Sequence, residues 1–324
     1  MTADQTRSVM IDIHHHFNPA GKDNDGSAWS IEMALDQMDE NGITAAIASL
    51  GPVSDWTNPD RPSRVRAWNE WGSKTCLDHP GRFGLFASLP LPHIDLALAE
   101  IAYAFDVLKV DGIAMSTNEG DLWLSDDRNR PIFDELNRRK AVIFVHPAPT
   151  SQCGALSRAY GGPDVSSPWL EFPVNSARAI LGLLAKGITR SHPDIRFIFC
   201  HGGGVMPLLL GRIAGFSGWK TVGPAKLTEL FPDGIYAEFQ KFYFDCGQAY
   251  APETMALLQR IVPTSHLLFG TDFSYFPISH SIAELAALDL TPDDRAAIAG
   301  GNAATLFPRF SQASAVSNKE RAHI

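Results

Sequence analysis

The sequence predicts an α/β protein that folds as a (β/α)8 TIM barrel. Short apolar runs alternate with helical stretches along the 324-residue chain, and eight strand-then-helix units can be placed. Histidines or a carboxylate follow four of the eight predicted strands. Barrel enzymes carry their active sites at the C-terminal ends of the strands, so we expect a metal site at that face. A doubly wound open sheet is the alternative arrangement of the same units.

Apolar runs bounded by turn residues predict the strands. They are Val9–Ile13, Ala45–Ser49, Phe83–Ser88, Gly112–Met115, Val142–Val145, Arg196–Phe199, Phe242–Asp245 and Leu267–Phe269. Apolar residues that recur at spacings of three and four predict the helices. These are Ser30–Asn41, Ser63–His79, Asp95–Leu108, Arg130–Arg139, Ser176–Lys186, Met206–Phe216, Pro252–Ile261 and, after the eighth strand, Thr291–Gly300.

Two segments are longer than ordinary connections, Pro147–Val174 and Gly218–Gln240. We expect both to be insertions that form lids or subunit interfaces. Residues 1–310 should make one metal-dependent barrel domain, and residues 311–324 a polar C-terminal tail.

The composition is that of a globular enzyme, with 45% hydrophobic and 19% charged residues. A net charge of -9 without a Lys/Arg run argues against nucleic-acid binding and polybasic membrane anchoring. No apolar run reaches the roughly 18 residues of a membrane helix. The four cysteines show no C-x-x-C spacing, which favours reduced thiols and a cytoplasmic location.

The residues at the strand ends predict a metal site. His14 and His16 follow the first strand and point the same way, while His15 between them points to the other face. His146 ends the fifth strand, and Asp272 follows the eighth. Three imidazoles and a carboxylate suit one divalent metal, zinc first and manganese second, and leave a position open for water or substrate.

Neighbouring residues refine this prediction. Asp12 or a backbone carbonyl is expected to orient the ligand imidazoles. The end of the fourth strand, Met115–Glu119, carries no lysine to bridge a second metal, which favours a mononuclear site. Gly202–Gly204 lacks the Lys-Ser/Thr of a phosphate-binding loop, so we interpret it as allowing the backbone to approach the metal and His201. The histidines outside these motifs are expected to be structural or surface residues: His79, His93, His192, His266, His280 and His323.

These motifs resemble the amidohydrolase superfamily. The resemblance runs from about Val9 to Phe307 and is carried by Asp12-x-His14-x-His16, His146-Pro147, His201-Gly202-Gly203-Gly204, Gly270-Thr271-Asp272 and Gly301-Asn302-Ala303. The chain looks most like the decarboxylating branch around aminocarboxymuconate-semialdehyde decarboxylase, and within it like 6-methylsalicylate decarboxylase-type proteins. The resemblance implies that His14, His16, His146 and Asp272 bind the metal, that His201 handles protons, and that the protein is a homodimer or a higher homo-oligomer.

The function we expect is metal-dependent, non-oxidative decarboxylation of a small aromatic acid, such as a 6-methylsalicylate-like hydroxybenzoate, or of a related unsaturated carboxylic acid, with release of CO2. Asp272 is the expected proton donor, because a buried carboxylic acid can hold its proton, and His201 would steer that proton or stabilise an oxyanion. The segment after the second strand, Ser49–Trp56, contains no arginine for a second substrate carboxylate, which favours a less charged aromatic acid.

Candidate substrate contacts are Asn118, Trp169, Arg178 and Tyr275. The same ligand set also permits a hydrolase that cleaves a lactone, an amide or a carbon–carbon bond. A catalytically silent scaffold is a third alternative, and it would be expected to lack at least one ligand or His201.

Overall fold

Eight parallel strands form the centre of the computed structural model, which describes residues 9–22, 28–50, 57–120, 122–150, 167–221 and 223–311. In their order around the sheet they are β1 (Ile11–Phe17), β2 (Ala45–Leu50), β3 (Phe83–Ser88), β4 (Gly112–Ser116), β7 (Val142–His146), β8 (Arg196–Phe199), β9 (Tyr243–Asp245) and β10 (Leu267–Leu268). Backbone hydrogen bonds join the two ends of this order, from Ile13 N to Phe269 O at 3.0 Å and from Asp272 N to His14 O at 2.8 Å. The sheet therefore closes, which confirms the barrel and excludes the open sheet.

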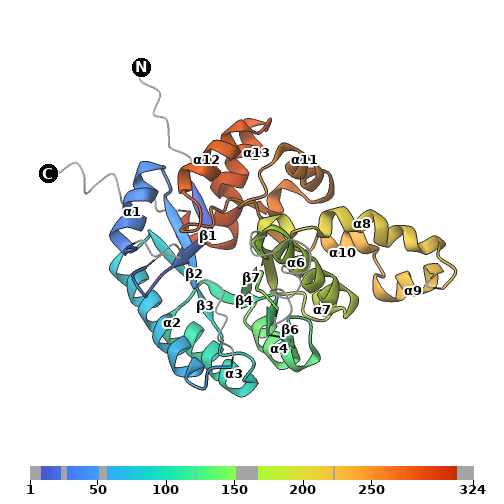
Figure 1. The fold of residues 1–324 in the computed structure, drawn as a ribbon, viewed down its shortest axis with the longest axis horizontal. Coiled ribbons are helices and arrows are strands. Elements are labelled where there is room, and N and C mark those ends of the chain that lie inside the picture. The colour runs from blue at the N-terminus through green and yellow to red at the C-terminus, as the bar shows by residue number, and fades with distance from the viewer. Residues whose placement is uncertain are drawn as a thin grey trace.

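Helices surround the strands (Figure 1). They are α1 (Ile31–Glu40), α2 (Arg61–Asp78), α3 (Ile94–Tyr103), α4 (Arg130–Arg138), α6 (Ser167–Ala185), α7 (Ile188–Ser191), α8 (Met206–Gly215), α9 (Gly223–Leu230), α10 (Ile235–Phe239), α11 (Pro252–Ile261), α12 (Ile278–Ala287), α13 (Pro292–Ala296) and α14 (Asn302–Leu306). A small antiparallel hairpin, β5 (Asn118–Glu119) with β6 (Leu122–Trp123), follows β4. No helix in the described ranges has both the length and the apolarity needed to cross a membrane.

The strands are buried on both faces, which is why they are nearly continuous apolar runs. One cluster fills the barrel interior and includes Ile11, Ile13, Phe86, Phe144 and Ile198. The rings of Phe86 and Phe144 stack there, with centroids 5.0 Å apart. A second cluster packs the outer faces of the strands against the helices. This closely packed interior leaves the loops at the strand ends to form the site.

The predicted end of the first strand was wrong. The strand continues from Ile13 to Phe17, so all three histidines lie within it. Parallel pairing with β2 persists along this extension, with Phe17 opposite Leu50, and the register shifts between Asp12 and His15. The apolar run ends at Ile13, but ladder hydrogen bonds hold the polar residues beyond it in extended backbone.

Several predicted helix boundaries also differ. Helix α6 begins at Ser167, nine residues before the predicted Ser176, so it occupies the end of the first insertion. Helix α12 was not predicted, the last predicted helix consists of α13 and a π-helical turn, and α14 follows beyond its predicted end. The second insertion contains α9 and α10. Residues 151–166 of the first insertion and 312–324 of the tail lie outside the described residues.

Candidate active site

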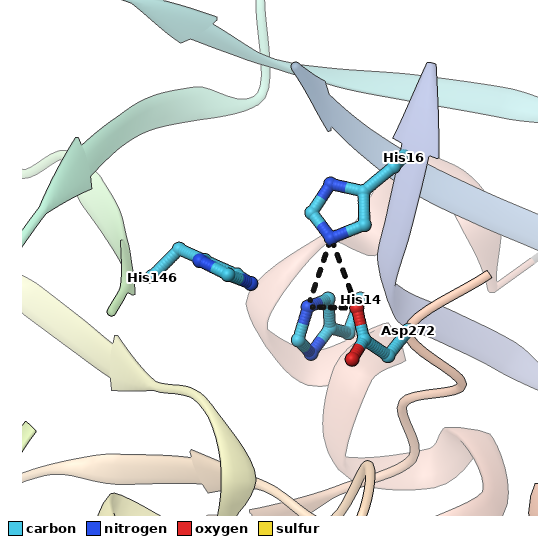
Figure 2. A group of neighbouring side chains, drawn as sticks. All are labelled: His14, His16, His146 and Asp272. Carbon is cyan, nitrogen blue, oxygen red and sulfur yellow. Dashed lines mark hydrogen bonds and ion pairs between the residues drawn. The ribbon is translucent and has the colours of Figure 1, made fainter. Parts of the chain in front are cut away.

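Four side chains from three places in the barrel converge at the C-terminal ends of the strands (Figure 2). His14 and His16 come from β1, His146 is the last residue of β7, and Asp272 follows β10. The two Nε2 atoms of His14 and His16 lie 3.2 Å apart, and Asp272 Oδ1 lies 3.3 Å and 3.1 Å from them. One ligand atom from each of the four residues lies within 4.8 Å of the others. All four side chains are buried.

Each imidazole has a polar group near its outer nitrogen. His146 Nδ1 donates to the carbonyl of Pro147 at 2.7 Å. Ser49 Oγ lies 3.3 Å from Nδ1 of His16, and Asp245 Oδ2 lies 3.1 Å from Nδ1 of His14. These contacts occupy the Nδ1 side of each ring, so Nε2 is the nitrogen available to a metal.

Asp12, which we expected to orient a ligand imidazole, has another role. It accepts hydrogen bonds from His14 N at 3.1 Å and from Thr271 N and Oγ1 at 3.0 Å and 2.6 Å. Its second oxygen lies 3.1 Å from Nδ1 of His15, whose ring faces away from the site against Phe273. Asp12 therefore ties β1 to the loop that carries Asp272. The predicted backbone carbonyl is present at Pro147, whereas sequence reasoning missed Asp245.

The pKa shifts favour neutral rings at His16 and His146, whereas His14 must lose a proton before it can bind a metal. Burial lowers the pKa of His146 well below its ordinary value, and burial also lowers the pKa of His16. Burial acts to raise the pKa of Asp272, but His14 and His16 outweigh it and hold that pKa well below the usual range. Burial acts to lower the pKa of His14, but Asp245 and Asp272 outweigh it and raise the pKa well above the usual value. This direction favours the ionised form of Asp272, whereas the sequence led us to expect a protonated acid; the catalytic role of Asp272 stays a prediction.

His201 lies beside this group. Its ring centroid is 5.0 Å from that of His14 and 5.7 Å from that of His146. Its Nδ1 donates to the carbonyl of Gly247 at 2.9 Å, which leaves Nε2 to exchange a proton. Its position resembles that of a general acid–base group adjacent to a metal.

The three glycines after His201 are needed for a reason that differs from our interpretation. All three have positive φ, which glycine adopts without a steric penalty. A Cβ would come within 2.9 Å of Leu258 at Gly202, within 2.8 Å of Phe244 at Gly203 and within 2.3 Å of the Pro173 carbonyl oxygen at Gly204. They allow the His201 turn to pack closely against its protein neighbours.

The four predicted substrate contacts lie in different settings. Tyr275 is half-exposed, and its ring meets that of His16 edge-on at 5.2 Å. Asn118 is buried, and its amide donates to the carbonyls of Gly120 and Pro149. Arg178 donates to Asn175 Oδ1 at 2.6 Å from the exposed side of α6, and Trp169, on the first turn of α6, is 74% exposed. The structure therefore brings Tyr275 next to the ligand group, while the Asn118 amide binds backbone.

A recess adjoins His146 at the ends of β2, β3, β4 and β7. Its lining is small, apolar or hydroxylic apart from His146 and one ion pair: Ser49, Leu50, Arg61, Val65, Ser88, Leu89, Ala114, Met115, Ser116, Glu119 and His146. Arg61 is buried and contacts Glu119 at 2.7 Å. Sequence reasoning missed this arginine because it looked only at the segment directly after β2. A wider cavity, of about 570 Å³, opens at the start of β8 and β9, the other end of the barrel, and contains none of the four ligand residues.

Comparisons with known proteins agree with this geometry. The family model described as Amidohydrolase matches residues 11–309. Decarboxylase yanB of Aspergillus niger is 32% identical, covering 93% of this chain and 88% of its own length. The 6-methylsalicylic acid decarboxylase acuB of Aspergillus aculeatus is 31% identical, covering 95% and 98%.

A solved dihydroxybenzoic acid decarboxylase from Polaromonas sp., with bound manganese and the inhibitor 2-nitroresorcinol, superimposes with a TM-score of 0.79. It is 22% identical, and the match covers 93% of this chain and 97% of that one, so it supports the fold. These matches agree with the strand-end histidines and with Asp272 after the last strand. The chain belongs to the amidohydrolase family, in its decarboxylase branch.

Proposed function

We propose that this protein is a metal-dependent, non-oxidative decarboxylase of a 2-hydroxybenzoate-type acid, such as 6-methylsalicylate. The observation that carries the proposal is the group His14, His16, His146 and Asp272, which is buried, convergent and next to a recess. Two relatives that match nearly the whole chain are named as decarboxylases, and one of them as acting on 6-methylsalicylic acid.

The donor set fits one divalent ion. Two Nε2 atoms 3.2 Å apart are both acceptors when the rings donate from Nδ1, and a cation between them and the Asp272 carboxylate relieves that repulsion. We propose zinc first and manganese second as the ion held by these four residues. When bound, it supplies positive charge that holds the carboxylate and the ortho oxygen of the acid and stabilises negative charge on them.

The recess supports a substrate with one carboxylate. The recess has a volume of only about 30 Å³, smaller than an aromatic ring, so Leu50, Val65, Leu89 and Met115 offer apolar contact to the edge of a ring and do not enclose it. Among the described lining residues the one arginine is paired with Glu119, so this pair adds little net positive charge for a second carboxylate. An acid whose single carboxylate and ortho oxygen turn toward the histidines fits this lining best, and Tyr275 stands at the rim beside His16.

The residues also suggest a proton route. Asp272 is ionised at rest, so it takes the proton of the ortho-hydroxyl group and delivers it to the ring carbon that bears the carboxylate. The bond to the carboxylate then breaks, CO2 leaves, and the electron pair returns to the ring, which becomes aromatic again as a phenolate. Water later returns a proton to the phenolate oxygen. His201, whose Nδ1 donates to Gly247, presents Nε2 to the substrate oxygens and stabilises their charge.

The test is release of CO2 from a panel of acids by protein reconstituted with zinc or with manganese. We expect release from 6-methylsalicylate or 2,6-dihydroxybenzoate, and much slower release from a ring with two carboxylates. The variant His146→Ala, which lacks a ligand, is the inactive control and should also fail to retain metal. Metal-loaded protein that releases no CO2 from any acid would contradict the proposal, and about one metal ion per chain is expected. The expected homo-oligomeric assembly remains a prediction to check by light scattering on the same sample.

A further inference from the structure

One buried carboxylate contacts both the ligand group and the turn that carries His201. Asp245 is the last residue of β9 and is fully buried. Its Oδ2 lies 3.1 Å from Nδ1 of His14. Its Oδ1 accepts hydrogen bonds from the N–H groups of Gly247 at 2.8 Å and His201 at 3.4 Å. The two oxygens therefore serve two different histidines.

The contact with His14 fixes which ring nitrogen carries the proton. An ionised carboxylate only accepts hydrogen bonds, so the nitrogen that faces it is the protonated one. Once the second ring proton has left, this leaves the lone pair on Nε2, which faces His16 Nε2 at 3.2 Å and Asp272 Oδ1 at 3.3 Å. A ligand imidazole needs that lone pair, and a carboxylate behind it also makes the nitrogen more basic.

The contact with Gly247 fixes the ring of His201. The N–H of Gly247 is held by Asp245, and the carbonyl of the same residue accepts from His201 Nδ1 at 2.9 Å. The backbone N–H of His201 also points at the carboxylate. Asp245 therefore positions the main chain of His201 directly and its ring through Gly247.

The carboxylate has little freedom to move. A Cβ added at Gly247 or at Gly270 would come within 3.0 Å of Asp245 Oδ1, which shows how closely these backbones press on it. The thiol of buried Cys200 completes the group, with ligand atoms of Cys200, His14 and Asp245 all within 4.8 Å of one another. In such a closely packed group one side chain cannot shift without its neighbours. The position of Asp245 can therefore determine the orientation of both histidines.

We propose that Asp245 is a positioning residue that couples the metal site to His201, by fixing the protonated nitrogen of His14 and the ring direction of His201. The inference rests on the proposed function only in taking His14 as a metal ligand and His201 as the group that interacts with the substrate. It does not depend on which acid is decarboxylated.

The deciding variant is Asp245→Asn. Two N–H groups converge on Oδ1, so the amide oxygen should remain there and the NH2 group should face His14 Nδ1. The amide NH2 group and the Nδ1–H of His14 then face each other as two donors, unless the His14 proton moves to Nε2. That move would protonate the nitrogen that binds the metal. We expect the affinity for Zn²⁺ and Mn²⁺, measured by titration of metal-free protein, to fall about 10–100-fold.

Two further variants separate positioning from packing. In Asp245→Ser the hydroxyl group lies one bond further from His14 Nδ1 than Oδ2 does, so no N–H donor opposes that nitrogen. This variant should therefore bind metal more tightly than Asp245→Asn, although asparagine has the closer shape. A packing role predicts the opposite order. The matched control is Glu238→Gln, an equally buried carboxylate held by Arg190 and Lys241, which should lose stability but keep its metal affinity.

Each outcome decides the question. A folded Asp245→Asn protein with unchanged metal affinity would overturn the proposal, and so would an Asn variant that binds at least as tightly as the Ser variant. Failure of both variants to fold would assign Asp245 to barrel stability and overturn positioning as well. Wild-type protein that binds metal but decarboxylates nothing would refute the proposed function alone, because the affinities still test Asp245.

Discussion

Replacing Gly204 by alanine tests how the barrel holds His201. Gly204 has φ +64° and ψ -128°, a conformation that costs other residues about 1–3 kcal/mol. The new Cβ would lie 2.3 Å from the carbonyl oxygen of Pro173, about 1 Å closer than the 3.4 Å at which ordinary contacts begin. That carbonyl accepts from Val205 N at 3.2 Å, so the backbones must separate and lose a hydrogen bond, which costs about 0.5–1.5 kcal/mol.

Together these terms destabilise the protein by about 2–4 kcal/mol, or roughly 3–6 °C in the melting temperature of a chain of this size. Metal content should be unchanged, because none of the four ligand residues lies on this turn, whereas CO2 release should fall as His201 shifts. Thermal unfolding, elemental analysis and the release assay on one preparation measure all three.

The control is Gly215→Ala. No heavy atom lies within 4 Å of its added Cβ, and its φ of -63° is helical, so stability should be unchanged or rise by about 0.4–1 kcal/mol. A Gly204→Ala protein with the same melting temperature as this control would refute the steric reasoning.

The remaining predictions concern the histidines. His201→Ala should keep its metal while kcat falls about 10²–10⁴-fold, and a fully active variant would remove His201 from the mechanism. Metal binding should release about one proton near neutral pH, because burial lowers the pKa of His14 but Asp245 and Asp272 outweigh it and raise that pKa, so a proton must leave before the metal binds. Affinity should therefore weaken as the pH falls; calorimetry in buffers of different ionisation enthalpy measures the proton, and an affinity that is flat from about pH 8 to pH 6 would contradict this prediction.

The sequence by itself was sufficient for the fold and for the set of candidate ligands. Alternation of apolar runs and helical periodicity is a local property, and it predicts the barrel because parallel strands need crossover helices. Barrel topology then brings all C-terminal strand ends to one face, so His14, His16, His146 and Asp272 could be grouped before any distance was known.

Only the tertiary structure decided what surrounds those ligands. Asp245 lies behind His14, and Arg61 with Glu119 lines the recess, through contacts between segments far apart in the chain that have no periodic signature. The extension of β1 to Phe17 likewise depends on pairing with β2 and not on its own residues. Asn118 looked like a substrate contact, yet its amide binds the carbonyls of Gly120 and Pro149, because a buried polar side chain must satisfy the nearest backbone groups. Residue type and spacing predict which groups can do chemistry, while packing determines the direction in which each group points and which protons it carries.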